Sequence, residues 1–277
     1  RTLFPYTTLF RSRFDEPATW AELVEIAETL QADGVTPFFI PGKEAWALAM
    51  QHAMVGVSTP GVDWIEELLV GDTNFLDPEL IEMNRMLNDL KQYYQSDFIA
   101  NSTAEQDAAF ALEDAAMVFY GIWGTTNWKE LNPEFEFGYF PVPPADTDDP
   151  ARAYVYMDGS YALNTSSDVA DAALTVLEFS ATPSYGEIFS GATGEMTAVA
   201  GVEMPADRPV LVEAYELSTT IAAEYIYWVG SPISAGSPSP YDILREGMQA
   251  MYLGDITPEE LAQQLQEGVS SWYEPLQ

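Results

Sequence analysis

The sequence predicts an α/β fold, because capped amphipathic helices alternate with short apolar segments that are typical of buried strands. The first alternation begins at Thr19–Glu22, a capping-box pattern in which Thr19 caps a helix and Glu22 reaches back to the cap amide. The apolar run Val35–Ile40 follows that helix and predicts a strand. The second alternation of helix and strand lies at Phe110–Trp123. There a short helix leads into the apolar strand Ala116–Tyr120, which ends at a glycine and a tryptophan.

The same signals predict the remaining elements in chain order. Apolar residues at helical spacing, Asp-Pro and Thr-Pro starts and a second capping box predict helices. These helices are Ala45–Val55, a segment starting at Asp77-Pro78, a segment starting near Ser102, Asp168–Ser180, Val210–Ala223, Tyr241–Leu253 and a segment starting at Thr257-Pro258. The further strands are Phe135–Pro141 and Tyr154–Leu163, the second broken by Asp158-Gly159. Loops rich in Pro, Gly and Ser are predicted at Pro143–Pro150 and Trp228–Pro240.

The first twelve residues differ from the rest of the chain. Arg1–Ser12 resembles a translated sequencing adapter, and the first thirteen residues hold Arg1, Arg11 and Arg13 in a chain that is otherwise poor in arginine. The segment also lacks the long apolar core and small-residue cleavage site of a signal peptide. We therefore interpret residues 1–12 as a non-native artefact, leave them out of the predicted fold, and expect the native amino terminus with any export signal to be missing.

Charge is the strongest compositional feature. The 277 residues include 44 acidic and 10 basic side chains, which gives a formal net charge of −34. Nucleic acid and anionic membrane surfaces would repel such a chain. The acidic residues are scattered, as on a hydrated surface, and the excess suits a salty environment in which counterions screen self-repulsion. Salt adaptation is a hypothesis here. No apolar stretch is long enough to predict a membrane-spanning helix, and no cysteine is present.

The sequence offers little support for catalysis. It contains no G-x-S-x-G elbow, no P-loop and no G-x-G-x-x-G fingerprint. His52 is the only histidine, so no histidine cluster can bind a metal, and we interpret it as a packed or surface residue instead of a catalytic base. A glycosidase-like carboxylate pair is compatible with the number of acids, but no pair stands out. We predict no catalytic residue, no metal site and no cofactor.

Five segments together resemble one family. Phe110–Trp123 resembles the F-x-x-G-x-A-A-M-x-x-x-G-x-W signature of extracellular solute-binding proteins of carbohydrate ABC transporters, the maltose-binding-protein-like group. The run that opens at Thr19 resembles the family's T-W-x-E-L segment. Gly138–Pro143 resembles its G-x-x-P-x-P pattern, and Asp168–Ser180 resembles its A-A-x-x-F-L-x-F-L helix. Gly254–Leu261 resembles its closing G-x-x-(S/T)-P-E-E-A-L motif. The matches occur in the family's order over nearly all of the chain after residue 12.

The resemblance implies a type II periplasmic-binding-protein-like fold, present as the second lobe plus part of the first. Residues 13–155 would form the second lobe, residues 156–205 its return segment into the first lobe, and residues 206–277 the carboxyl-terminal helices of the second lobe. The family has a further lobe segment before T-W-x-E-L that has no counterpart here, so we expect a chain truncated at its amino terminus. The apolar face of the return segment would then be exposed.

The resemblance also implies a receptor and not an enzyme. Such a receptor captures a sugar or oligosaccharide between two lobes, closes on it, and delivers it to the permease subunits of an ABC importer. Aromatic faces would stack on sugar rings and polar groups would bind hydroxyls. The predicted ligand-binding residues are Trp123, Trp46, Glu44, Tyr156, Asp158, Gly159, Trp228 and Tyr241. Trp20, Trp64 and Trp272 are predicted to be structural.

The resemblance implies a periplasmic or extracellular monomer that reaches the membrane through the permease or a lost lipid anchor and binds no nucleic acid. Two alternatives stay open. The same fold could bind a polyol, glycerol phosphate or polyamine, although the scarcity of Lys and Arg disfavours a phosphate. The chain could also be a secreted carbohydrate-active enzyme or a carbohydrate-binding module.

Overall fold

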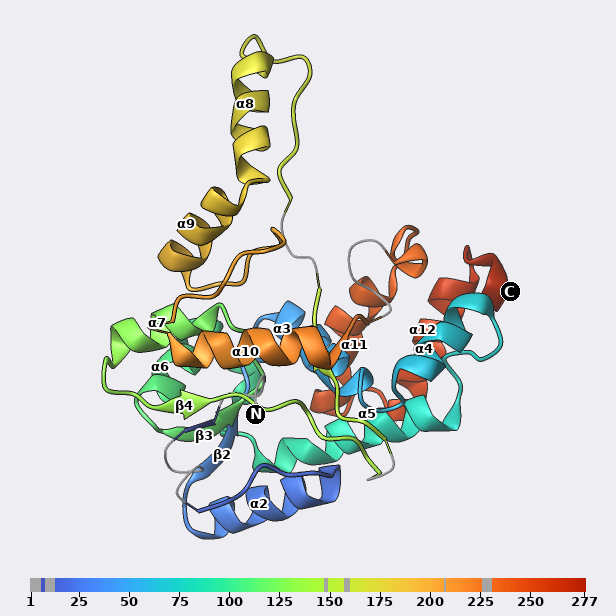
Figure 1. Cartoon of the computed structure of the whole chain (residues 1–277). Helices are drawn as coiled ribbons and strands as arrows, with labels where there is room; N and C mark the ends of the chain where they lie inside the picture. The colour runs from blue at the N-terminus through green and yellow to red at the C-terminus, as the bar shows by residue number, and fades with distance from the viewer. Residues whose placement is uncertain (1–5, 8–12, 147–148, 157–159, 207, 226–230) are drawn as a thin grey trace.

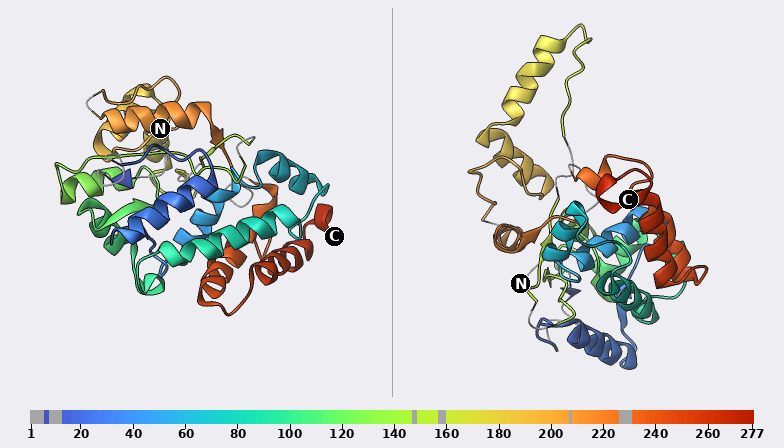
Figure 2. Two further views of the ribbon diagram at one scale, coloured as in Figure 1. Left: turned by 90° about the horizontal axis from the view of Figure 1, so that it is seen from below. Right: turned by 90° about the vertical axis from the view of Figure 1, so that its right-hand side faces the viewer.

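A computed structural model describes residues 6–7, 13–146, 149–156, 160–206, 208–225 and 231–277. Helices surround a small sheet, and two helices, α8 and α9, rise away from the rest of the molecule (Figures 1 and 2). The α/β prediction is confirmed, since short strands alternate with helices along most of the chain.

The elements have the following bounds. The α-helices are α2 (Trp20–Ala32), α3 (Ala45–Gly56), α4 (Val62–Val70), α5 (Pro78–Leu90), α6 (Thr103–Ala111), α7 (Gly124–Leu131), α8 (Ala170–Ser180), α9 (Pro183–Thr193), α10 (Pro209–Thr220), α11 (Pro240–Leu253) and α12 (Pro258–Ser270). The strands are β1 (Tyr6–Thr7), β2 (Thr36–Phe39), β3 (Ala115–Val118), β4 (Phe137–Gly138), β5 (Ala153–Tyr154) and β6 (Ala222–Ala223). Short 3-10 turns cover Lys91–Tyr93, Phe98–Ala100, Pro232–Ser234 and Glu274–Leu276.

The main sheet has the strand order β2-β3-β1-β4. Strands β2 and β3 are parallel, with Phe38 opposite Met117, and helix α2 packs on β2 while α6 packs on β3. Strand β1 is antiparallel to both β3 and β4. Leaving residues 1–12 out of the fold was therefore wrong for Tyr6–Thr7, which fill the gap between β3 and β4. The artefact origin of the segment stays a prediction.

Helix starts follow the predicted caps, with one change in detail. The Thr19 hydroxyl accepts a hydrogen bond from the Glu22 amide at 3.2 Å, but the Glu22 carboxylate accepts from the Ala18 amide at 2.7 Å and not from the cap amide. The predicted reciprocal box is therefore displaced by one residue. At α12 the box is complete, because Thr257 and Glu260 each accept a hydrogen bond from the other's amide.

The core forms two clusters that meet at β3 and the residues after it. Met117 and Phe119 pack into the larger cluster, which lies among α2, α3, α5, α11 and α12. Val118 and Tyr120 pack into the smaller one with aromatic residues of α6, α7 and β4. Successive side chains of an extended strand point to opposite faces, so one short segment serves both clusters.

Several predicted strands are shorter than their sequence patterns indicated. Of Phe135–Pro141 only Phe137–Gly138 is paired, and of Tyr154–Leu163 only Tyr154 belongs to a strand among the described residues. The long crossing strand was therefore wrong outside β5, because the chain after Tyr154 has no neighbouring strand to pair with in the part that is described. Helices α4, α7 and α9 were not predicted.

Glu113 occupies a position that favours glycine. Its φ is +62°, in the left-handed region that side chains with a Cβ rarely adopt. The residue lies in the turn between α6 and β3, and the solute-binding signature has glycine at this position. The chain therefore bears some backbone strain at the turn that leads into its central strand.

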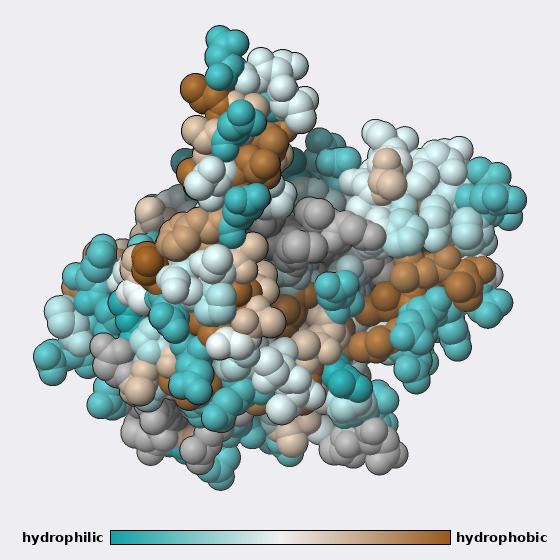
Figure 3. Space-filling view, turned by 45° about the horizontal axis from the view of Figure 1, so that its top comes forward, coloured by the Kyte–Doolittle hydropathy of each residue, from teal (hydrophilic) through white to brown (hydrophobic). Residues whose placement is uncertain are grey.

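The α8–α9 arm, defined as residues 160–194, carries apolar side chains on its outside. No residue of α8 is buried, and Val176 and Ile188 are 65% and 61% exposed. Figure 3 shows hydrophobic side chains along the projecting arm. This agrees with the expectation of an exposed apolar face on the predicted return segment. At its foot the arm is tied to α7, because the Thr126 hydroxyl donates to the Thr193 carbonyl at 2.8 Å.

His52 is a buried residue of α3, in agreement with the packed alternative of the sequence prediction. Its Nε2 lies 3.1 Å from Asn84 Oδ1, and its ring packs edge-on against Tyr225 with centroids 5.6 Å apart. Since an amide oxygen only accepts, Nε2–H donates to it. Burial lowers the pKa of His52 to about 3, although the bond to Asn84 opposes this shift. No described helix combines the length and apolarity needed to cross a bilayer.

The lowered pKa of His52 predicts a loss of stability in mild acid. At a pH above the ordinary pKa of histidine, the imidazole is neutral in both the folded and the unfolded state. At a pH below it, the unfolded chain binds a proton at His52 that the folded chain does not bind. We expect this to remove about 2 kcal/mol of unfolding free energy between pH 7 and pH 5. Urea titrations of the protein and of His52→Gln at both pH values would measure the difference. An equal loss in the variant would contradict the assignment.

Candidate functional site

The amino-terminal end of α3 forms the first part of the candidate site. Glu44 is the residue before the helix, and its carboxylate accepts a hydrogen bond from the Trp46 indole N–H at 3.0 Å. The same carboxylate accepts from the Thr103 amide and hydroxyl at the start of α6, each at 3.0 Å. Trp46 is half-buried and packs against both core clusters. The loop before α3 is thereby attached to the start of α6.

The residues that follow β3 form the second part. Tyr120 is buried, and its ring lies 5.1 Å from the half-buried ring of Trp123, at 58° to it. Gly121 permits this arrangement, because a Cβ there would lie 1.8 Å from an atom of the Trp123 ring. Like Trp46, Trp123 packs against both core clusters. We call Trp46, Tyr120 and Trp123 the aromatic group.

A buried carboxylate lies near Tyr120 of the aromatic group. Asp107 of α6 is only 8% exposed, and its Oδ1 accepts a hydrogen bond of 2.7 Å from the Trp128 indole. Its other oxygen accepts from the Asn127 amide at 3.4 Å. The Trp128 ring in turn lies 5.7 Å from Tyr120. Asp107 therefore fixes α7, the helix that Trp123 begins.

The two carboxylates have pKa values shifted in opposite directions. Partial burial works to raise the pKa of Glu44, but hydrogen bonds from Thr103 and Trp46 outweigh it and lower the pKa. Burial raises the pKa of Asp107, the negative charge of Glu44 adds to the rise, and bonds from Trp128 and Asn127 reduce it. Burial, with the charge of Asp107 as a smaller cause, raises the pKa of Tyr120 to about 12. Glu44 is thus ionised and Tyr120 neutral near pH 7.

A second set of aromatic residues lies toward the other end of α3. Tyr154 stacks on Tyr156 with centroids 5.2 Å apart, and nearby Tyr225 and Tyr241 contribute to the raised pKa of Tyr154, which burial dominates. The Tyr225 ring packs on His52 and covers Gly56. We call Tyr154, Tyr156, Tyr225 and Tyr241 the tyrosine group. Trp46 near the start of α3 and Gly56 at its end lie about 15 Å apart along the helix axis, so the two groups lie toward opposite ends of this helix.

The predicted site residues fall into three sets. Glu44 and Trp46 lie together at the start of α3, and Trp123, like Trp46, packs against both core clusters. Tyr156 and Tyr241 lie in the tyrosine group. Asp158, Gly159 and Trp228 lie outside the described residues. Ligand contact by any of these residues stays a prediction.

Sequence reasoning missed Asp107, Tyr120 and Thr103. Tyr120 was assigned to the strand, although its position directly before the Gly-x-Trp end of the signature could have suggested it. Asp107 stands in a helix rich in alanine, Thr103–Ala111, where a buried acid has no periodic signal. Its importance depends on an indole that lies 21 residues further along the chain. Only the fold reveals that contact.

The candidate site combines residue types that suit the recognition of a small molecule. Flat aromatic faces supply apolar contact, and the tyrosine hydroxyls and carboxylates supply a few directional polar groups, a combination that is typical of small-molecule sites. The described residues contain no group of three or more His, Cys, Asp or Glu side chains placed to hold a metal ion. His52 lies in the core between α3 and α5, where its ring is hydrogen-bonded to Asn84.

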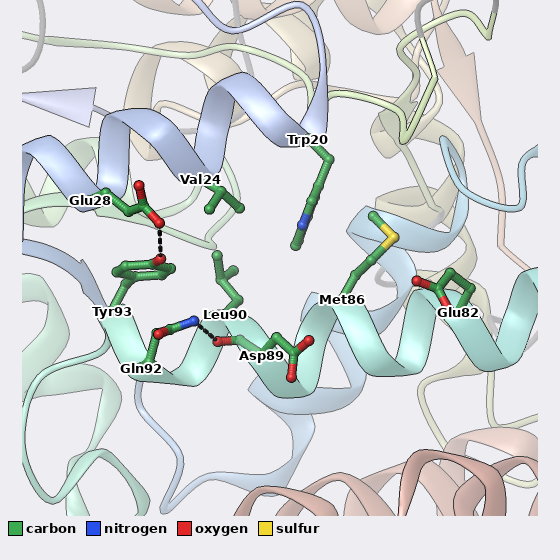
Figure 4. Close-up of a pocket in the computed structure, with 9 residues that line it drawn as sticks. All are labelled: Trp20, Val24, Glu28, Glu82, Met86, Asp89, Leu90, Gln92 and Tyr93. Atoms are coloured by element: carbon green, nitrogen blue, oxygen red, sulfur yellow. Dashed lines mark hydrogen bonds between the residues drawn. The ribbon is translucent and has the colours of Figure 1, made fainter.

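A separate groove of about 290 Å³ lies between α2 and α5. Figure 4 shows Trp20, Val24, Met86 and Leu90 around it, with the carboxylates of Glu28, Glu82 and Asp89 at its border. The Glu28 carboxylate accepts a hydrogen bond from Tyr93 at 3.0 Å. None of the predicted site residues lines this groove, so we do not include it in the candidate site.

Comparison with known proteins identifies a matching protein family. The sequence model of the family described as "Bacterial extracellular solute-binding protein" matches residues 3–187, which is more than half of the chain.

Two relatives share part of the sequence. The multiple sugar-binding protein of Streptococcus mutans is 28% identical over 137 residues, covering 46% of this chain and 32% of the relative. An uncharacterised ABC transporter extracellular-binding protein of Pyrococcus horikoshii is 28% identical over 124 residues, covering 44% of this chain and 28% of the relative. The matched segments therefore span about a third of the relatives' lengths.

The fold is also found in solved structures. A sugar transporter protein from Bacillus licheniformis, crystallised in complex with stachyose, superposes with a TM-score of 0.76 at 19% identity. The match covers 99% of this chain and 71% of the other. At this identity the likeness establishes the fold alone, and it confirms the type II binding-protein prediction.

The buried bond between Asp107 and Trp128 predicts different effects for two substitutions. Asp107→Asn keeps an acceptor for the indole and removes a buried charge, so we expect a change in unfolding free energy of less than about 1 kcal/mol. Asp107→Ala leaves the buried indole N–H without its acceptor and should cost about 1–3 kcal/mol. Thermal and urea unfolding of both variants would measure this. Equal destabilisation by Asn and Ala would show that the hydrogen bond is unimportant.

Proposed function

The chain belongs to the bacterial extracellular solute-binding protein family, and from this we propose that it is part of a receptor that captures a sugar or oligosaccharide for an ABC importer. The family is one of binding proteins, and its name implies a periplasmic or extracellular location. The single observation that carries the proposal is the aromatic group, in which two half-buried tryptophans of separate elements lie at the junction of the two cores.

The chemistry of the two aromatic groups supports a carbohydrate. The apolar C–H face of a sugar ring fits a flat aromatic face, and hydroxyl groups need neutral donors and acceptors such as the phenol of Tyr156. The spacing of about 15 Å along α3 suits an elongated oligosaccharide that contacts both groups. The relative from S. mutans is named a multiple sugar-binding protein, and the B. licheniformis structure contains stachyose. Both names are consistent with this class of solute.

Capture of a solute between two lobes requires the surface of a second lobe. The α8–α9 arm supports the division into lobes that was predicted from the sequence. We assign Tyr6–Thr7, residues 13–155 and residues 206–277 to one lobe, and residues 156–205 to a return segment that packs on a further lobe. The exposed Val176 and Ile188 supply the apolar face for this packing. Solute bound between the two lobes would favour the closed state, which the permease subunits would recognise at the membrane.

A titration tests the proposed solute and its site. NMR titration of the 277-residue chain with stachyose, maltose and glucose should show weak binding with Kd roughly in the millimolar range, because these residues supply one wall of the site. Trp123→Ala should weaken that binding at least about tenfold, since stacking area is lost.

Trp272→Ala provides the matched control. It removes another half-buried indole, which follows α12, donates a hydrogen bond to the Pro238 carbonyl and is not a member of the aromatic group. Its sugar affinity should equal that of the unmodified protein. A folded chain that binds none of the sugars at saturating concentration would contradict a sugar solute, and binding of a polyol or polyamine instead would support that alternative.

The exposed arm predicts dye binding that can be removed without loss of stability. Val176→Ser with Ile188→Ser should reduce the fluorescence of the apolar dye ANS and change the unfolding free energy by less than about 0.5 kcal/mol, because both side chains are exposed. Leu253→Ser removes a residue of equal exposure, 61%, at the end of α11, and should reduce ANS fluorescence less. A large stability loss in the arm variant would show that the two residues already have packing partners.

A further inference from the structure

We propose that Glu44 is a positioning residue, whose carboxylate holds the Trp46 ring in place so that the solute meets the indole face and not the carboxylate. The inference rests on the proposed function, since it states how one predicted site residue acts through another. It changes the role of Glu44 from an acceptor of solute hydroxyls to a support for the aromatic group.

The geometry of the carboxylate carries the argument. Oε2 accepts from the Trp46 indole at 3.0 Å, and Oε1 accepts from the Thr103 amide at 3.0 Å. The Thr103 hydroxyl lies 3.0 Å from both oxygens and fills the space between them. Three donors of the protein therefore surround one carboxylate. Few of its lone pairs are left for a solute hydroxyl.

The bond to Glu44 fixes the orientation of the Trp46 ring. The ring is half-buried and packs against both core clusters. A charge-assisted hydrogen bond to a fixed acceptor selects one orientation. The acceptor is fixed because Thr103, at the amino terminus of α6, binds it through both backbone and side chain, where the helix dipole favours a negative charge.

Helix α6 organises a second indole in the same way. Asp107 lies four residues after Thr103, on the same face of the helix, and accepts from the Trp128 indole. Helix α6 thus holds Trp46 in place through Glu44. Through Asp107 it also holds the start of α7, where Trp123 lies. Trp46 and Trp123 are therefore both held by contacts to one rigid helix. Side chains that are already ordered lose less conformational entropy when a solute binds.

Two variants separate positioning from ordinary helix capping. Glu44→Ala removes the acceptor of Trp46. Glu105→Ala is its matched control, since the Glu105 carboxylate also binds the start of α6, where it accepts from the Ser102 amide and hydroxyl at 2.7 Å each. Both variants lose a carboxylate near the same helix terminus and should lose similar stability.

The readout is the indole N–H resonance of Trp46 in ¹H–¹⁵N spectra, assigned with Trp46→Phe. In Glu44→Ala we expect this resonance to shift and its hydrogen exchange to accelerate at least tenfold, while in Glu105→Ala both stay unchanged. On acidification the resonance should move as Glu44 takes up its proton, below the ordinary pKa of a glutamate, and this step should be missing in Glu44→Ala. An unchanged Trp46 resonance in Glu44→Ala would overturn the proposal.

Stachyose titration then tests the consequence for binding. If stachyose binds, Glu44→Ala should weaken it several-fold, Trp46→Phe should weaken it similarly, and the double variant should be no weaker than either, since both act through one ring. Additive losses would show that Glu44 contacts the sugar itself and would overturn the positioning role. Absence of stachyose binding by the unmodified protein would contradict the sugar proposal, while the indole resonance would still decide the role of Glu44.

Discussion

The alternation of side chains along β3 and the residues after it is the constraint on which the rest of the structure depends. Met117 and Phe119 pack into one cluster, and Val118 and Tyr120 pack into the other. Because a strand presents successive residues to opposite faces, a single register fixes both clusters at once. The segment then ends at Tyr120, Gly121 and Trp123. The strand register that fixes the two clusters therefore also sets the positions of Tyr120 and Trp123. A glycine at 121 is needed because the Trp123 ring lies directly over it.

The acidic residues act differently at the surface and in the interior of the protein. A net charge of −34 leaves the surface strongly self-repulsive, and the ion pairs among the described residues, such as Arg85 with Glu82 and Glu259, lie on that surface. Exposed pairs of this kind contribute little. Stability must come from the apolar clusters and from acids held by specific donors, as Asp107 is by Trp128. Salt adaptation stays a hypothesis, since these contacts are compatible with either environment.

The same helix that stabilises the fold organises the candidate site. Helix α6 binds Glu44 at its first turn and Trp128 through Asp107 at its second, and its Phe110 packs edge-on against Trp128 with centroids 4.7 Å apart. The aromatic residues of the candidate site are thus supported by polar hydrogen bonds as well as by packing. Such support is costly to lose, because an indole N–H without an acceptor in the interior bears the full cost of its desolvation.

The sequence by itself determined the local elements and the family. Caps at Thr19 and Thr257, apolar periodicity and the strand ending at Trp123 are local patterns, and they placed most helices within a few residues. Tertiary structure decided what local patterns cannot encode. It placed Tyr6–Thr7 inside the sheet, shortened strands that had no pairing partner, and left α8 without a buried face. It also joined Glu44 to Thr103 and Asp107 to Trp128, contacts across 59 and 21 residues. A side chain's hydrogen-bond partner depends on which elements pack together, and that choice is made by the whole chain.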